Sequence, residues 1–423
     1  MDGHGKPGGI GRGLPRFRGF ATYAHKTIGP AAGFVTAWLY WLCWVAALAS
    51  EFTASALIMG RWFPGVDTWV WCLLFAAALF GLNAYSVRWF GEAESWFSTV
   101  KVATIVVFIV LGAALILGWR APDSGAPLLG NFLTPEGLFP TGLSGVALTT
   151  LAVFYAFSGT ELIAITAGET AEPQRTIPRA LRATLLRLLL FFVGAIFVVA
   201  ALLPYSPNGE AAEETVENSP FVMVFEQAGI PYAADLMAIV VIIALLSAGN
   251  SGLYACSRLL YSLAHKGQLP AAFGRTTAKG VPLLAVAVSL AGGLFSLFNS
   301  VLSPGGVYLA LVSIAGFAVV AVWIIIVVAH LSYRRAYLAA GGSLADLPYR
   351  APGYPWVPYL TLAACLVSLV AVAFDPNQVA ALLFGVPFVV LCLAIYYLVV
   401  APAGRSPQGL PGNSRREGPR GRR

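Results

Sequence analysis

Apolar residues are grouped along this chain in long blocks, not at the short intervals typical of a soluble protein. A block of about 20 apolar residues is long enough to cross the hydrocarbon core of a bilayer as a helix. Ten such runs lie near residues 31–60, 69–87, 95–118, 143–165, 183–203, 233–263, 282–301, 306–330, 357–374 and 379–400. The pattern predicts an all-α integral membrane protein with ten transmembrane helices.

The composition supports a membrane protein. Hydrophobic residues make up 58% of the 423 positions and charged residues only 11%, and the mean hydropathy is +0.77. A soluble domain of this length cannot bury that much apolar surface. The five cysteines, Cys43, Cys72, Cys256, Cys365 and Cys392, all fall within predicted spans and lack metal-ligand spacing. We therefore expect them to be packing residues and expect neither a metal nor a cofactor.

The positive charges are concentrated in alternate loops, which lie on one side of the predicted bundle. All but three of the 26 lysines and arginines lie in the two tails and in alternate loops, the exceptions being Arg61, Lys101 and Arg120. This distribution indicates membrane topology and not a nucleic-acid-binding patch. It predicts that these loops and both termini are cytoplasmic. The opposite loop at 204–232 carries five glutamates.

The tails differ from the apolar body. Residues 1–18 are basic and rich in glycine and lack the apolar core of a signal peptide, and residues 404–423 are rich in glycine, proline and arginine. We expect three parts: an atypical N-terminal segment at 1–18, a transmembrane domain at 19–403 and a disordered basic tail at 404–423. There is no Walker-type nucleotide loop and no catalytic triad spacing. Transport would then depend on an ion gradient.

The fourth apolar run is interrupted near its end by Ser158, Gly159, Thr160 and Glu161. Every backbone amide needs a partner in hydrocarbon, so a glycine break survives where it faces protein or a water-filled cavity. Transporters use such broken helices as binding sites. The alternative is a kinked helix whose glutamate pairs with a neighbouring helix.

Two more ionisable residues lie inside predicted spans. Lys101 lies a turn or two into the third run, where burial can bring a lysine's proton affinity into a usable range. The alternative is a lysine whose ammonium reaches the headgroups. Glu51 in the first run is a possible pathway residue or a structural partner of another polar group.

Polar residues also follow the break and interrupt the sixth run. Glu169 lies eight residues after Glu161, about 12 Å along a helix, and could form the inner mouth of a cavity or pair with nearby arginines. In the sixth run, the small residues around Asn250 and Ser251 permit close helix packing. These two residues could also line a transport path.

Together these residues resemble the amino acid permease branch of the amino acid/polyamine/organocation superfamily, and most closely its lysine-specific and basic amino acid permeases. About 380 residues share the likeness. The segments that carry it are FATY at 20–23, FGEAE at 90–94 with Lys101, GTELIAITAGE at 159–169, IPRA at 177–180, LSAGNSGLYA at 246–255 and DLPYR at 346–350.

The resemblance implies a five-plus-five inverted-repeat fold followed by two further helices, with the amino acid bound between two broken helices. Phe157 and residues 158–160 correspond to the second break, which contacts the substrate's amino end. Glu161 and Glu169 match the acidic pair of lysine permeases. Lys101 matches the lysine that exchanges the coupling proton in relatives.

The expected function is secondary active transport: proton-coupled uptake of lysine or another basic amino acid across a bacterial plasma membrane. Alternatives are a neutral or broad-range permease, and an amino acid sensor that binds without transporting. No nucleic acid partner is expected, and the sequence does not indicate the oligomeric state.

In this resemblance, the first run of this chain matches the third helix of the family, so the family's first two helices have no counterpart here. A one-nucleotide shift of the codons for residues 7–19 permits family-like residues, Leu-Gly-Glu and Pro-Val-Ser-Gly. Residues 1–18 are therefore interpreted as a possible frameshift product.

Overall fold

The computed structural model describes residues 19–85, 87–119, 130–132, 139, 141–161, 173–203, 219–343, 353–376 and 378–403. Within these ranges the secondary structure is helical, with turns between helices. The expectations for the two tails, 1–18 and 404–423, and for Glu169 lie outside the described residues.

The helices follow one another along the chain with short connections. The α-helices are α1 (Phe20–Thr27), α2 (Pro30–Met59), α3 (Thr68–Tyr85), α4 (Val87–Ile116), α5 (Gly142–Ala156), α7 (Pro173–Leu188), α8 (Gly194–Leu202), α10 (Pro220–Gln227), α11 (Ala233–His265), α12 (Leu283–Gly293), α13 (Pro304–Ala339), α14 (Trp356–Val372), α15 (Val379–Ile395) and α16 (Ala401–Ala403). Short 3-10 turns are η1 (Gly130–Phe132), η4 (Ala271–Gly274) and η5 (Leu294–Ser300), and π-helical segments are η3 (Leu189–Val193) and η7 (Tyr396–Val400).

The apolar runs predicted from the sequence coincide with apolar helices. In the described part of the chain, seven helices are long and apolar enough to cross a membrane: Pro30–Met59, Trp96–Ile116, Arg179–Leu202, Ala233–His265, Leu283–Ser300, Pro304–Ala339 and Val379–Val400. Three shorter apolar helices, Thr68–Ala84, Gly142–Ala156 and Trp356–Val372, fall on the other predicted runs.

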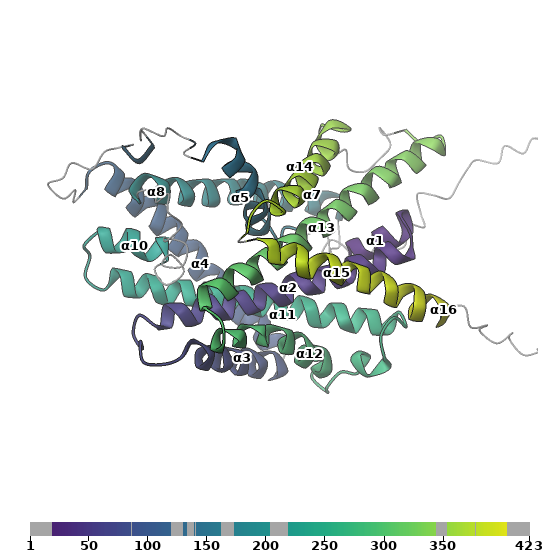
Figure 1. The fold of residues 1–423 in the computed structure, drawn as a ribbon, viewed down its shortest axis with the longest axis horizontal. Coiled ribbons are helices and arrows are strands. Elements are labelled where there is room, and N and C mark those ends of the chain that lie inside the picture. The colour runs from purple at the N-terminus through teal and green to yellow at the C-terminus, as the bar shows by residue number, and fades with distance from the viewer. Residues whose placement is uncertain are drawn as a thin grey trace, which may run out of the picture.

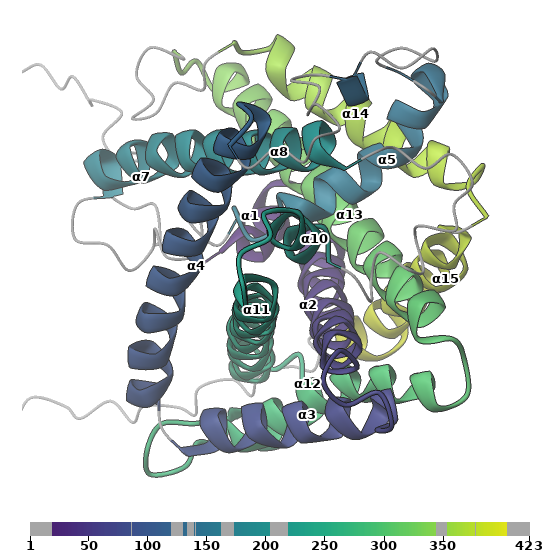
Figure 2. The same cartoon turned by 90° about the vertical axis from the view of Figure 1, so that its left-hand side faces the viewer.

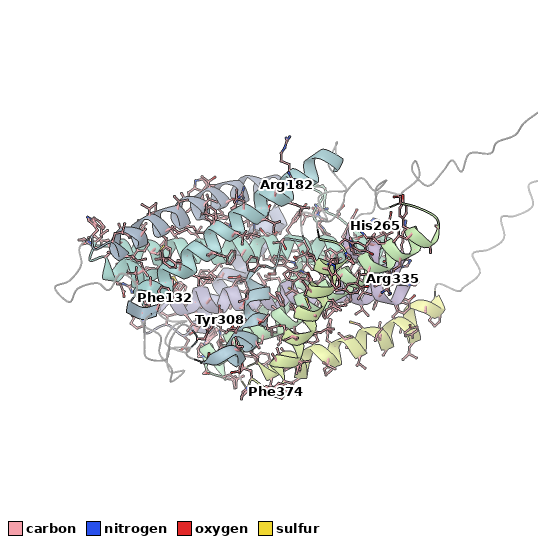
Figure 3. All side chains as sticks on the ribbon, turned by 90° about the horizontal axis from the view of Figure 1, so that it is seen from above. Phe132, Arg182, His265, Tyr308, Arg335 and Phe374 are labelled. Atoms are coloured by element: carbon pink, nitrogen blue, oxygen red, sulfur yellow. The ribbon has the colours of Figure 1, made fainter. Side chains whose placement is uncertain are left out.

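The long helices share one direction, which defines the axis of the bundle. In Figure 1, α2, α11, α13 and α15 extend along the long axis of the molecule. Turning the molecule shows α2 and α11 in the middle, with α4 on one side, α13 and α15 on the other and α3 beneath (Figure 2). Figure 3 places His265 and Arg335 toward one end of this axis and Phe132 toward the other.

Helix α2 is central because small residues let its neighbours approach closely. A Cβ added to Gly252 of α11 would lie 2.4 Å from Cε3 of Trp44, and one added to Gly292 of α12 would lie 2.3 Å from Cγ1 of Val45. Only glycine fits at these two contacts. Small residues at helix interfaces are the usual means of close packing in membranes, and here they bring α11 and α12 close against α2.

Two helices of eight residues, α1 and α10, fall outside the predicted apolar runs. Helix α1 packs on the start of α2, where a Cβ on Gly33 would lie 2.6 Å from Cβ of His25. Helix α10 packs on α8 and α11 through Val222, Val224 and Phe225, which belong to the same apolar core as Val198 and Met237. Both helices lie across the ends of longer ones.

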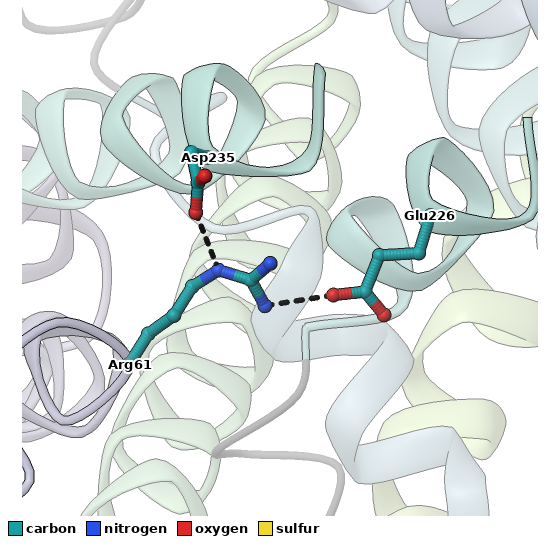
Figure 4. A network of polar contacts seen from close by, with 3 residues as sticks. All are labelled: Arg61, Glu226 and Asp235. Carbon is teal, nitrogen blue, oxygen red and sulfur yellow. Dashed lines mark hydrogen bonds and ion pairs between the residues drawn. The ribbon is translucent and has the colours of Figure 1, made fainter. Parts of the chain in front are cut away.

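An arginine joins three elements at the end of the bundle where α11 begins. Arg61, just after α2, donates through Nε to Asp235 of α11 and through Nη1 to Glu226 of α10, both at 2.7 Å (Figure 4). The hydrogen bonds to Asp235 and then to Glu226 raise the pKa of Arg61. The three side chains are partly exposed, so each ion pair contributes little stability by itself.

Candidate functional site

The sequence predicted a broken helix at residues 158–161, and α5 ends there. Its last residue is Ala156, and residues 157–161 form turns. Gly159 has φ of +90°, a conformation that side-chain-bearing residues rarely adopt. Residues 162–172 lie outside the described part of the chain. The glycine thus has a structural reason to be at the point where the helix stops.

The carboxylate of Glu161 is held at this break by N–H groups. The backbone N–H of Gly159 donates to both carboxylate oxygens, at 3.0 and 3.1 Å. The indole N–H of Trp323 on α13 donates to Oε2 at 3.4 Å. Glu161 is 8% exposed, so these donors replace part of the hydration that its charge loses on burial.

Tyr40 and Trp44, one turn apart on α2, lie beside the same break. The Tyr40 hydroxyl interacts with the carboxylate of Glu161, and a Cβ added to Gly159 would lie 3.8 Å from Cη2 of Trp44. Neither the hydroxyl of Tyr40 nor the indole N–H of Trp44 meets the geometry of a hydrogen bond. An unpaired buried donor costs about 1–3 kcal/mol, so an acceptor placed here would be stabilised.

A second polar group lies deeper along α2, around Glu51. The ammonium of Lys101 on α4 donates to the hydroxyl of Ser247 on α11 at 2.8 Å and interacts electrostatically with Glu51. Glu51 also interacts electrostatically with Tyr155 of α5 and Tyr308 of α13. Four helices besides α2 therefore contribute to this group.

The two groups are separate but share two helices. Tyr40 and Glu51 are eleven residues apart on α2, about 16 Å along the helix axis. Tyr155 is the second-to-last residue of α5, and its hydroxyl interacts with Ser50, next to Glu51. Helix α5 therefore leads from the second group directly into the break.

Asn250 and Ser251 on α11 differ in burial and in their contacts. Asn250 is fully buried and accepts a hydrogen bond at 2.7 Å from Asn83 of α3, while its own amide N–H group has no partner. Ser251 is half-buried. The contact with Asn83 supports the packing interpretation for Asn250, and Ser247, one turn earlier, is the α11 residue that contacts Lys101.

The other predicted site residues line the break. Phe157 stacks on Phe192, with ring centroids 5.0 Å apart, and Ser158 and Thr160 are half-buried. Glu169, the second carboxylate of the predicted pair, lies outside the described residues. Among the residues that the structure describes, no cluster of three His, Cys, Asp or Glu side chains could hold a metal ion.

Sequence reasoning did not identify the aromatic residues of either group: Tyr40, Trp44, Tyr155, Tyr308 and Trp323. A signal was present, because Tyr and Trp inside an apolar run carry a polar atom that needs a partner. Their partners lie on other helices, so the pattern within one helix could not distinguish them from ordinary core aromatics.

Comparison of the chain with known proteins identifies its family. The model of the amino acid permease family matches residues 9–402. A protein of Bacillus subtilis (strain 168) provisionally named a histidine permease is 46% identical over 91% of this chain and 80% of its own length. Amino-acid permease RocE of the same organism is 45% identical over 90% and 80%, and the lysine-specific permease LysP of Escherichia coli (strain K12) is 36% identical over 91% and 81%.

These matches extend across both polar groups and the helices that carry them. The chain is a multi-pass membrane protein, and its family consists of transporters rather than enzymes. The turn after α5, the buried carboxylate and the lysine paired with serine all lie within the matched residues. The chain belongs to the amino acid permease family.

Proposed function

We propose that this protein carries out proton-coupled uptake of lysine or another basic amino acid across a bacterial plasma membrane. The observation that carries the proposal is the buried Glu161 carboxylate at the end of a broken helix, with unpaired donors next to it. A carboxylate in a cavity attracts a cationic side chain and disfavours an anionic one. Among the relatives, two are named lysine-specific permeases.

In this proposal, the turn at residues 157–160 binds the amino end of the substrate. Glu161 and Glu169 bind its cationic side chain. Three N–H contacts already reach the carboxylate of Glu161, but an ionised carboxylate offers about four acceptor positions. The unpaired hydroxyl of Tyr40 and indole of Trp44 supply further donors to a bound molecule.

Lys101 is proposed to exchange the coupling proton. Its neighbours fit that role, since Ser247 accepts a hydrogen bond from the ammonium and Glu51 interacts with it electrostatically. Loss of the proton would leave Glu51 without a nearby cation. The altered electrostatics of Glu51 would also act on Tyr155 of α5, which interacts with both Glu51 and Ser50.

The proposed topology follows the basic residues. Residues 19–403 form the permease domain, and the ten apolar helices are its membrane spans, which belong to a fold built on five-plus-five inverted repeats with two further helices. The connection at 266–282, which holds Lys266, Arg275 and Lys279, then lies in the cytoplasm with both termini. The Arg61 cluster lies on the outer face.

A neutral or broad-range amino acid permease is the second candidate. It is favoured by the same contacts that hold Glu161, because a carboxylate engaged by Gly159 and Trp323 has less capacity for a cation. The names of the relatives include histidine and gamma-aminobutyric acid as well as lysine, so family membership does not choose between the two.

The Glu161→Gln variant tests the choice. If Glu161 binds a cationic side chain, uptake of lysine should fall about tenfold or more, which is about 1.4 kcal/mol, while uptake of a neutral analogue of similar length falls much less. Glu226→Gln is a matched control, because it removes the same charge from an exposed position. Equal losses for lysine and the neutral analogue would make Glu161 structural and favour the second candidate.

A further inference from the structure

A small cleft away from both polar groups lies where α3 ends, α11 approaches its end and α12 begins. The empty space counted for it, open solvent included, is about 250 Å³, and its enclosed part is about 10 Å³, which is room for about one water molecule. The lining residues are Asn83, Tyr254, Ser257, Arg258, Val281, Pro282 and Val286. Figures 1 and 2 both show α3, α11 and α12 side by side. The transport proposal assigns this cleft no role.

Arg258 is the charged residue of the cleft, and its guanidinium is poorly neutralised. Its Nε is buried without a hydrogen-bond partner, and Nη2 makes a long contact of 3.4 Å with the carbonyl of Gly280. Within the described part of the chain, the ion pairs involve Arg61 and not Arg258. Arg258 is half-buried, and a partly desolvated cation without an anionic partner favours an anion.

Aromatic rings hold the guanidinium in position. Cζ of Arg258 lies 5.3 Å from the ring centre of Tyr254 and 6.0 Å from that of Tyr261. These residues are four before and three after Arg258 on α11, so all three share one face of the helix. Two rings restrict the side chain, and the Nη groups of this half-buried residue, unlike the covered Nε, remain for a ligand. An arginine fork presented in this way suits an oxyanion such as phosphate.

The other polar side chains of the cleft are already engaged. Asn83 donates to the carbonyl of Leu79 and to Asn250, and the hydroxyl of Ser257 donates to the carbonyl of Tyr254. No carboxylate is among the lining residues. No lining residue therefore cancels the positive charge of Arg258.

The depth of the cleft corresponds to the lipid headgroups. Arg258 is seven residues before the end of α11 at His265, about 10 Å along the helix axis. Beside the cleft, Leu283 and Leu284 at the start of α12 are 40% and 41% exposed. A polar, positive cleft next to exposed leucines matches a molecule with a charged head and apolar chains.

We propose that this cleft binds the phosphate of an anionic phospholipid in the cytoplasmic leaflet. The phosphate accepts from the Nη groups of Arg258, and the acyl chains lie along Leu283 and Leu284. Basic pockets between membrane helices on the cytoplasmic side bind anionic headgroups in this way. The leaflet, but not the binding itself, depends on the proposed topology.

Lipid binding to the purified full chain in detergent tests the proposal. Phosphatidylglycerol should raise the midpoint of thermal unfolding, because a ligand that binds only the folded state stabilises it, whereas phosphatidylcholine should not. Arg258→Gln should abolish this shift and weaken phosphatidylglycerol binding at least tenfold. Arg275→Gln removes the same charge from an exposed position outside the cleft, and it should leave the shift intact.

Three results would overturn the proposal: an undiminished shift in Arg258→Gln, an equal shift with phosphatidylcholine, or an equal shift with inorganic phosphate alone, which would identify a site for free phosphate. If Arg258→Gln does not fold, competition on the unaltered chain decides. A large excess of sn-glycerol 3-phosphate should then displace phosphatidylglycerol, and failure to displace it contradicts the proposal. None of these readouts requires transport, so they are independent of the proposed function.

Discussion

The ionisable residues proposed to bind the substrate and the proton are kept in contact with specific partners by the fold. A charged side chain at the centre of a membrane helix costs about 2.5–3.5 kcal/mol on insertion scales. Glu161 offsets part of this cost with N–H donors from Gly159 and Trp323, and Lys101 with Ser247 and Glu51. The two residues therefore have different environments, which fits the different roles proposed for them.

Replacing Lys101 tests whether proton coupling can be lost while amino acid binding is kept. Lys101→Gln keeps a side chain that can donate to Ser247 but cannot exchange a proton. We expect the variant to bind and exchange amino acid while losing accumulation driven by a pH gradient. The measurement is uptake into proteoliposomes with and without an imposed gradient, compared with substrate exchange at equal pH.

The control for this experiment is Lys279→Gln, which removes a lysine from the exposed connection before α12. It should retain gradient-driven accumulation. If Lys101→Gln still accumulates substrate in response to the gradient, another group carries the proton and Glu51 becomes the next candidate.

At the scale of elements, the contact between α2 and α11 supports both polar groups. Gly249 and Gly252 let the helices approach until a Cβ on Gly249 would lie 3.0 Å from Leu48 and 3.8 Å from Cβ of Glu51. Ser247, also on α11, accepts the hydrogen bond from Lys101 of α4. The distance between the helices therefore controls the geometry around Glu51 as well as the position of Trp44 beside the break.

Gly252→Val should destabilise the protein, because even a Cβ at this position would lie 2.4 Å from the ring of Trp44. Overpacking of this kind costs about 1–3 kcal/mol. Thermal unfolding in detergent measures the effect. Gly81→Ala is the matched control in α3, where an added Cβ meets nothing within 4 Å, so it should be neutral or stabilising by up to about 1 kcal/mol. A folded Gly252→Val protein as stable as the parent would contradict the close contact.

Apolar run length predicted the long helices well, because the bilayer imposes it. The sequence also located the break, since Gly159 and Glu161 interrupt an apolar run. It could not pair Glu51 with Lys101 or assign Tyr155 to both Glu51 and Ser50, because those contacts join different helices. The helices α1 and α10 were also not predicted, since eight residues are too few to span a membrane.

On the scale of the whole molecule, the two ends of the bundle carry different charge patterns. One end holds the ion cluster of Arg61, Glu226 and Asp235 (Figure 4). The connection between α11 and α12 at the other end carries Lys266, whose pKa is lowered by burial, together with Arg275 and Lys279. Cytoplasmic loops of membrane proteins are enriched in lysine and arginine, so the difference between the ends predicts the orientation.

Cysteine labelling tests this orientation, and the chain suits it because its five native cysteines are buried, each at most 3% exposed. Gly65→Cys and Ala271→Cys place a thiol in exposed positions at opposite ends, and a Cβ at Gly65 meets nothing within 4 Å. A membrane-impermeant maleimide added to intact cells should label Gly65→Cys and leave Ala271→Cys unlabelled until the cells are opened. The reverse pattern would place the basic connection outside and move the Arg258 cleft to the outer leaflet. Labelling of both in intact cells would contradict the placement of α11 as a membrane span, because an odd number of crossings must separate the two positions if α3 to α11 span as proposed.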